Sequence, residues 1–175
     1  MRKSLPVVSG QARAQLVRLH GAVDAMTAPL VAQHRDRLQC ARGCNACCVD
    51  GISVFALEAA RIVAHHGELL ETGAAHPEGA CAFLDAEGAC RIYEHRPYVC
   101  RTQGLPLRWL EERGDELVEL RDCCELNFAD DSGASLTELP EEQCFTLGPV
   151  EQRLREEAEQ ASAAERVALR SLFRS

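Results

Sequence analysis

The feature that most constrains this chain is a dense cluster of cysteines. Cys40, Cys44, Cys47 and Cys48 lie within one nine-residue stretch, C-A-R-G-C-N-A-C-C. Packing alone rarely gathers four thiols in this way, whereas thiolates are strong ligands for zinc, for iron in iron–sulfur clusters and for Cu(I). A glycine within the stretch and another just after it allow the backbone to turn tightly. The cluster therefore predicts a loop that folds around metal.

A disulfide framework is the alternative, because the chain has ten cysteines in all. Two observations argue against it. The N-terminus lacks the apolar run of a secretory signal, so we expect a cytoplasmic protein whose thiols stay reduced. The sequence also contains neighbouring pairs, which bridge each other only with strain. The six cysteines outside the cluster are Cys81, Cys90, Cys100, Cys123, Cys124 and Cys144.

The size and charge of the chain restrict its architecture and its partners. At 175 residues it is expected to form one domain that buries its own core. The formal net charge of −8 argues against nucleic acid and anionic membranes, since both need a basic surface. No apolar run reaches the length of a membrane span. We therefore expect metal ions and a redox or protein partner, and the sequence leaves the oligomeric state open.

Apolar periodicity predicts an α+β fold, rich in helix, with small β-ribbons around the cysteine site. Helices are expected over 10–38, 57–70 and 148–173, and hairpins over 81–93 and 105–120. Pro29 predicts a kink or a break in the first helix near Thr27. The apolar stripe of this helix predicts packing in the core, with a dimer interface as the alternative; it consists of Leu16, Leu19, Val23, Met26 and Leu30.

These elements divide the chain into three segments of a single domain. Residues 1–38 form an N-terminal helical segment, and residues 39–127 form the cysteine-cluster metal-binding domain. Residues 128–175 comprise an acidic loop and a C-terminal helix that packs on the same domain.

The cysteine spacing favours some metal sites over others. Cys40, Cys44 and Cys47 reproduce the C-x3-C-x2-C motif of radical S-adenosylmethionine enzymes, but the chain lacks the β/α alternation of their barrel, and a fourth cysteine follows directly. Zinc ribbons pair two C-x2-C units, and no second unit follows here. The pattern is therefore typical of a metal site without being a standard zinc module. Neighbouring arginines, among them Arg96 and Arg101, could offset the thiolate charge.

Taken together, the cysteines and their surroundings resemble a known family. C-x3-C-x2-C-C followed by C-A-F-L-D-A-E-G-A-C-R-I-Y-E-H-R-P-Y-V-C-R is similar to the YkgJ-type cysteine-cluster proteins, described as a zinc- or iron-chelating domain. The resemblance covers roughly residues 38–127. It implies Tyr93, Arg96 and Arg101 as accompanying positions around the metal and leaves Cys123 and Cys144 outside the pattern. The metal ligands that it implies are Cys40, Cys44, Cys47, Cys48, Cys81, Cys90, Cys100 and Cys124.

Three functions are compatible with this pattern. The all-sulfur ligand set favours an iron–sulfur cluster, [4Fe-4S], with a redox or electron-transfer role. Eight thiolates would also suit two closed zinc sites with a structural or metal-handling role. Metal-dependent modification of a protein is the third, so whether the chain is an enzyme stays open. We expect Cys40, Cys44 and Cys47 to share one centre with a distant fourth ligand such as Cys100.

The six histidines contribute less to this interpretation. A single histidine is more often a surface or core residue than a ligand. His95 is the strongest exception, because it lies between Cys90 and Cys100.

Overall fold

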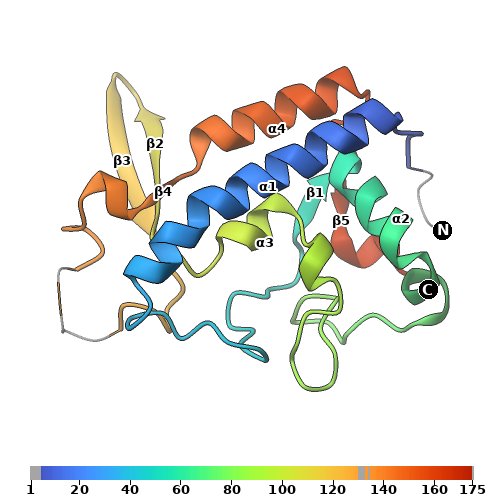
Figure 1. Ribbon diagram of the computed structural model, residues 1–175, viewed down its shortest axis with the longest axis horizontal. Helices are drawn as coiled ribbons and strands as arrows, with labels where there is room; N and C mark the ends of the chain where they lie inside the picture. Colours follow the sequence, from blue (N-terminus) through green and yellow to red (C-terminus); the bar gives the residue numbers. More distant parts are fainter. Residues whose placement is uncertain (1–4, 130–132, 134, 175) are drawn as a thin grey trace.

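The computed structural model describes residues 5–129, 133 and 135–174, and it confirms the α+β class. Figure 1 shows two long antiparallel helices along one side, a β-ribbon at one end, and the cysteine loops along the opposite side. Among the described residues, the helices are α1 (Gly10–Gln33), α2 (Ala56–Thr72), α3 (Tyr98–Thr102) and α4 (Gly148–Gln160), with 3-10 turns η1 (Tyr93–His95), η2 (Glu141–Gln143) and η3 (Leu169–Leu172).

Helix α1 packs against each of the other three α-helices. Ser9 caps its N-terminus by accepting a hydrogen bond from the amide of Ala12. The predicted break near Thr27 is wrong, because the helix runs through Pro29 without interruption. The Thr27 hydroxyl donates to the carbonyl of Asp24 within the helix instead of capping a second piece. The helix ends at Gln33, five residues before the predicted end.

The buried face of α1 only partly matches the predicted apolar stripe. Met26 is 49% exposed, whereas two polar residues, His20 and Thr27, are buried. The stripe therefore packs in the core through its remaining members, which are Leu16, Val23 and Leu30, with Leu19 partly buried against them.

Two small sheets complete the fold. The antiparallel strands β2 (Leu107–Arg113) and β3 (Glu116–Asp122) form the predicted second hairpin, with a turn of only two residues at Gly114, where φ is +66°. Strand β4 (Phe145–Thr146) adds to β2 in parallel. Elsewhere β1 (Ser53–Phe55) pairs with β5 (Arg166–Ala168), so the C-terminal segment lies beside the start of α2.

The predicted hairpin over 81–93 is replaced by a loop. It contains a single bridge between Leu84 and Cys90 and no regular strands. The Asp85 carboxylate accepts hydrogen bonds from the amides of Glu87 and Ala89, which takes the place of a strand ladder. The chain still reverses here. Cys81 therefore lies in the hydrophobic core, and Cys90 packs against the same core.

The predicted C-terminal helix is too long, because α4 ends at Gln160. Ser162 adopts a positive φ of 51°, and the amide of Ala163 bonds back to the carbonyl of Ala158, which turns the chain away from the helix axis. The residues that follow form β5 and η3. Part of the predicted acidic loop, residues 130–132 and 134, lies outside the described residues, as do residues 1–4.

Candidate metal centre

The cysteine cluster forms a loop of tight turns between α1 and β1. The amide of Cys44 donates to the carbonyl of Ala41, and the amide of Cys48 donates to that of Asn45. Gly43 has φ of +87° between these two turns, a conformation that other residues rarely adopt. The loop therefore brings four thiols together over a short length of chain.

One group of four thiols lies against the hydrophobic core. Cys81 is 9% exposed and belongs to the core, and Cys48 and Cys90 pack against it. A hydrogen bond from the amide of Cys81 to the carbonyl of Cys48 joins their two loops. Burial, with the charges of Cys81 and Cys90, raises the pKa of Cys100 to about 12. We call Cys48, Cys81, Cys90 and Cys100 the inner thiols.

A second group lies nearer to solvent, between the cysteine loop and the end of β3. Burial raises the pKa of Cys40, and so do the charges of Cys44, Cys47 and Cys124, while a hydrogen bond from Asn127 lowers it. None of these four thiols belongs to the described core, and Cys40 is exposed. We call Cys40, Cys44, Cys47 and Cys124 the outer thiols.

The two groups meet at the neighbouring pair Cys47 and Cys48. A hydrogen bond between these thiols lowers the pKa of Cys47 and raises that of Cys48, so the pair favours one thiolate and one thiol. The eight thiols thus form two sets, and Cys47 links them through Cys48 and through its charge near Cys100. Among the described residues, no three or more His, Cys, Asp or Glu side chains are arranged to hold a single metal ion.

The comparison with family models matches this segment directly. Residues 39–125 match the family model CxxCxxCC, described as "putative zinc- or iron-chelating domain". Residues 39–125 are a CxxCxxCC domain. The family indicates metal binding through chelation of zinc or iron, in agreement with the predicted resemblance. No curated protein and no solved structure matches the chain.

The two remaining cysteines of the chain differ in their surroundings. Cys123 lies beside the outer thiols of the CxxCxxCC domain and donates to the carbonyl of Gly104 at 3.3 Å. The pKa of Cys123 is raised to about 12 by burial and by the charges of Cys124, Asp122 and Cys40. Cys144 is buried beside β4, and its charged neighbours include Arg121 and Arg108. The structure therefore adds Cys123, but not Cys144, to the surroundings of the outer group.

Asn127, just beyond the matched segment, holds the outer group in place. Its side chain accepts from the amide of Gln39 at 2.7 Å and donates to the carbonyl of Gly104 at 2.6 Å. The same amide nitrogen lies 3.4 Å from the sulfur of Cys40. Gly104 allows this close approach, because a Cβ on it would lie 2.7 Å from that sulfur and its φ is +90°.

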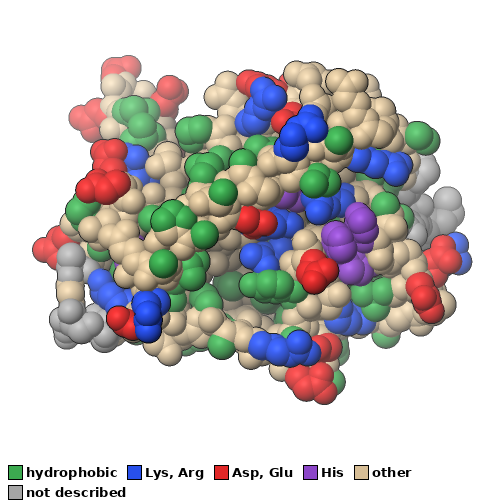
Figure 2. Space-filling model, viewed as in Figure 1, with side chains coloured by type: hydrophobic (Ala, Val, Ile, Leu, Met, Phe, Trp, Pro, Cys, Tyr) green, Lys and Arg blue, Asp and Glu red, His purple; other side chains and the backbone are tan. Residues whose placement is uncertain are grey.

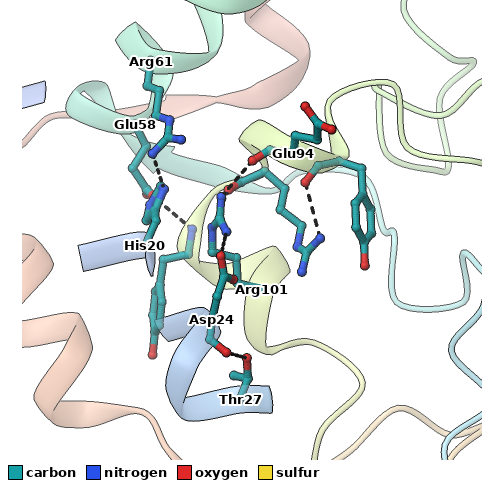
Figure 3. Close-up of polar contacts among 10 residues, drawn as sticks. His20, Asp24, Thr27, Glu58, Arg61, Glu94 and Arg101 are labelled. Atoms are coloured by element: carbon teal, nitrogen blue, oxygen red, sulfur yellow. Dashed lines mark hydrogen bonds and ion pairs between the residues drawn. The ribbon is translucent and has the colours of Figure 1, made fainter. Parts of the chain in front are cut away.

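Arg101 organises the turn that joins two of the inner cysteines. Its side chain is 5% exposed and pairs with Asp24 of α1 at 2.6 Å. The other guanidinium nitrogens donate to the backbone carbonyls of Arg96 and Glu94 (Figure 3). Arg101 therefore fixes the chain between Cys90 and Cys100 through the backbone.

A buried polar network continues from α1 to the start of α3. His20 lies between Glu58 and Arg61, with a ring nitrogen 3.1 Å from each partner (Figure 3). Because arginine only donates, Nδ1 of His20 accepts and Nε2–H donates to the carboxylate. Glu58 also accepts from the amide of Tyr98 at 2.7 Å. The network thus fixes α3, the helix that carries Cys100.

The other predicted accompanying residues lie near the surface. Tyr93 is 63% exposed, and the guanidinium of Arg96 stacks 3.9 Å above its ring. Arg96 also lowers the pKa of Cys90, which burial raises. Arg96 therefore acts on the inner group through its charge, while the ring of Tyr93 packs against the Arg96 guanidinium.

Arg170 of η3 holds two cysteine-bearing loops together from outside the CxxCxxCC domain. Its guanidinium pairs with Asp50, two residues after the cysteine cluster, and holds the pKa of that carboxyl at about 2. It also donates to the carbonyls of His76, Pro77 and Ala80, just before Cys81. Sequence analysis did not identify Arg170 or Asn127, because their partners lie far away along the chain.

A pocket of about 520 Å³ opens beside the outer group. Cys47, Cys123 and Cys124 form one wall, and apolar side chains including Ile52, Val99, Leu105 and Leu107 form much of the rest. Two of the outer thiols, Cys47 and Cys124, thus face this pocket, and none of the inner thiols lines it. Among the described residues, no helix is both long and apolar enough to cross a membrane.

Proposed function

We propose that the CxxCxxCC domain holds two centres with four thiolates each. Cys40, Cys44, Cys47 and Cys124 would bind the outer centre. The division rests on the charges that act on Cys40, which come from Cys44, Cys47 and Cys124, and on those that act on Cys100, which come chiefly from Cys81 and Cys90. Cys124 thereby takes the place that sequence analysis gave to Cys100. The ligands of the inner centre would be Cys48, Cys81, Cys90 and Cys100.

We infer that the metal is iron in [4Fe-4S] clusters. A single zinc ion with bonds of about 2.3 Å would hold its four sulfurs about 3.8 Å apart. A cluster distributes its ligands over four iron atoms and so separates them further. What supports the cluster is that all eight candidate ligands are cysteine thiols, a ligand set that iron–sulfur clusters take. Such clusters supply one-electron transfer when bound.

The surroundings of the two groups support a role in electron transfer. Four thiolates on a [4Fe-4S]2+ cluster leave a charge of about −2, so two filled sites would carry about −4. Arg96 and Arg91 lie beside Cys90 of the inner group and offset part of this charge. The outer group adjoins the open pocket, where a redox partner could approach. We therefore propose exchange of electrons at the outer centre and a more protected inner centre.

Purification without oxygen tests the metal. We expect a brown protein that absorbs near ~400 nm and contains iron and inorganic sulfide in equal amounts. A colourless protein that releases two zinc ions per chain would contradict the clusters and leave two closed zinc sites in their place.

A metal-dependent enzyme is the second candidate, and only the pocket favours it. To separate the two functions, Val99→Trp would partly fill the pocket. An electron-transfer protein would keep its cluster spectrum and its reduction by dithionite. An enzyme would also keep both but would lose binding of its substrate.

A further inference from the structure

Three of the six histidines meet on one face of the molecule. His65 and His66 belong to α2, and His95 ends η1. Nε2 of His66 lies 3.0 Å from Nδ1 of His95. The ring of His65 stacks on that of His95 with centroids 3.9 Å apart. Figure 2 shows histidine side chains gathered at the surface on this face.

A local distortion of α2 makes this meeting possible. Neighbouring residues of a regular helix point about 100° apart and do not contact the same side chain. His66 departs from the helix, with φ of −128° and ψ of 29°. The distortion lets both His65 and His66 contact the ring of His95. Helix irregularities of this kind often occur at functional positions.

We propose that His65, His66 and His95 form a separate binding site for a divalent ion that favours imidazole ligands, such as Zn2+ or Ni2+. Two nitrogens bound to one tetrahedral zinc at 2.0–2.1 Å lie about 3.3 Å apart, close to the separation of the His66 and His95 nitrogens. Imidazole is a good ligand for both ions. This site goes beyond the cysteine centres and does not depend on what they bind.

The protonation of the rings suits a metal ligand, which must be neutral. Burial and the neighbouring histidines lower the pKa of His66 and of His95. Glu94 opposes these effects on both rings, and Arg61 adds to the lowering at His95. In the neutral pair one ring donates to the other. Binding requires the donor ring to move its proton to its other nitrogen, so two lone pairs face the ion without net loss of a proton.

His65 provides the third ligand by a rotation. Its side chain is exposed, so its ring can leave the stack without disturbing the core. In this structure the three rings do not converge on one point. Among the described residues, no three or more His, Cys, Asp or Glu side chains are arranged to hold one metal ion. We expect the ion to bind the His66–His95 pair first and His65 to close the site.

Titration of the full chain with Ni2+, its cysteine sites loaded as purified, tests the site. Bound Ni2+ is paramagnetic and broadens the proton resonances of nearby imidazole rings. We expect three of the six histidines to broaden first, and these three resonances to be the ones lost in His65→Ala, His66→Ala and His95→Ala. His76→Ala is the matched control, because it removes a histidine that lies in the loop before Cys81.

Affinity gives the second measurement. Loss of a metal's supporting partners alone costs 10–100-fold in affinity, so His95→Ala should weaken Ni2+ binding by about 100-fold or more. His65→Ala, at an exposed position, should weaken it less and leave the fold unchanged. Equal Ni2+ affinity in wild type, His65→Ala and His95→Ala would overturn the proposal, as would initial broadening of His76 instead of the cluster.

Discussion

The short cysteine cluster contributes Cys48 to the inner thiols and Cys40, Cys44 and Cys47 to the outer thiols, but the two groups are held by different physical means. The inner group is part of the core: Cys81 belongs to it, and Cys48 and Cys90 pack on it. The outer group lies outside the described core, and single polar contacts such as that of Asn127 hold it in place. Neighbouring residues, Cys47 and Cys48, divide between the two. Stability and reactivity can therefore be separated within one domain.

This comparison predicts that ligand substitutions will affect the fold unequally. Cys100→Ser should remove the inner metal and lower stability by more than about 3 kcal/mol, because metal binding and core formation are coupled there. Cys44→Ser should remove the outer metal with a smaller loss of stability. Metal analysis and thermal unfolding of both variants measure the difference. Full metal content and wild-type melting in Cys44→Ser would refute its role as a ligand.

The next largest effect is expected at Arg101. Arg101→Met leaves Asp24 and two backbone carbonyls without their partner, and breaking a buried pair costs about 3–5 kcal/mol. Because Asp24 is 49% exposed, we expect about 3 kcal/mol, with loss of metal from the inner group first. Arg113→Met is the matched control, since its ion pair with Glu111 is exposed and worth no more than about 1 kcal/mol. Similar denaturation midpoints for the two variants would contradict this view.

The difference between the groups also explains what sequence could predict. Eight cysteines with characteristic local spacing identified the family, and strong apolar periodicity located α1 and α2. The partition of the thiols was not accessible, because it depends on how loops separated along the chain meet in space. Asn127 contacts a residue 88 positions away and Arg170 one 120 positions away. No local pattern marks such residues before the fold is known.

The failures of sequence analysis at helix ends have a similar origin. Pro29 lies inside α1, because packing on three other helices outweighs the lost backbone hydrogen bond. The region after Gln160 has helical composition, but the pairing of β5 with β1 and a positive φ at Ser162 determine its path. Tertiary contacts thus overrode local preference at both places.

Arg170 should matter to the inner group more than to the outer. Arg170→Ala frees the loop before Cys81 from Asp50 and removes the donor to three backbone carbonyls. We expect a smaller loss of stability than for Arg101→Met, because the guanidinium is partly exposed. Arg170→Lys should recover part of the loss. Arg174→Ala, on an exposed arginine nearby, serves as the control in chemical denaturation.

Asn127 offers the opposite test, on the outer group. Asn127→Ala removes the partners of the Gln39 amide and the Gly104 carbonyl, and should cost about 1–2 kcal/mol. Asn127→Asp keeps the acceptor for Gln39 but removes the donor near the sulfur of Cys40. We expect this variant to shift the spectrum or potential of the outer centre and to leave the inner centre unchanged. Equal changes at both centres would weaken the separation between them.

The smallest expected effect is a pH dependence of stability that arises from His20, in the buried network that fixes α3 and its Cys100. His20 is 2% exposed, and burial holds its pKa below the ordinary value of 6.5. Protonation at Nδ1 would break the bond from Arg61 and set two cations together.

Since the unfolded chain binds this proton more readily, the stability that neutral His20 provides is present above pH 6.5 and is lost as the pH falls below it. The loss is at most about 1.4 kcal/mol per pH unit. His20→Gln cannot titrate, so its unfolding free energy should change less between pH 7 and pH 5. Comparison of the two profiles cancels the protonation of thiols that both proteins share. Parallel profiles would show that His20 does not make the support of the inner group sensitive to acid.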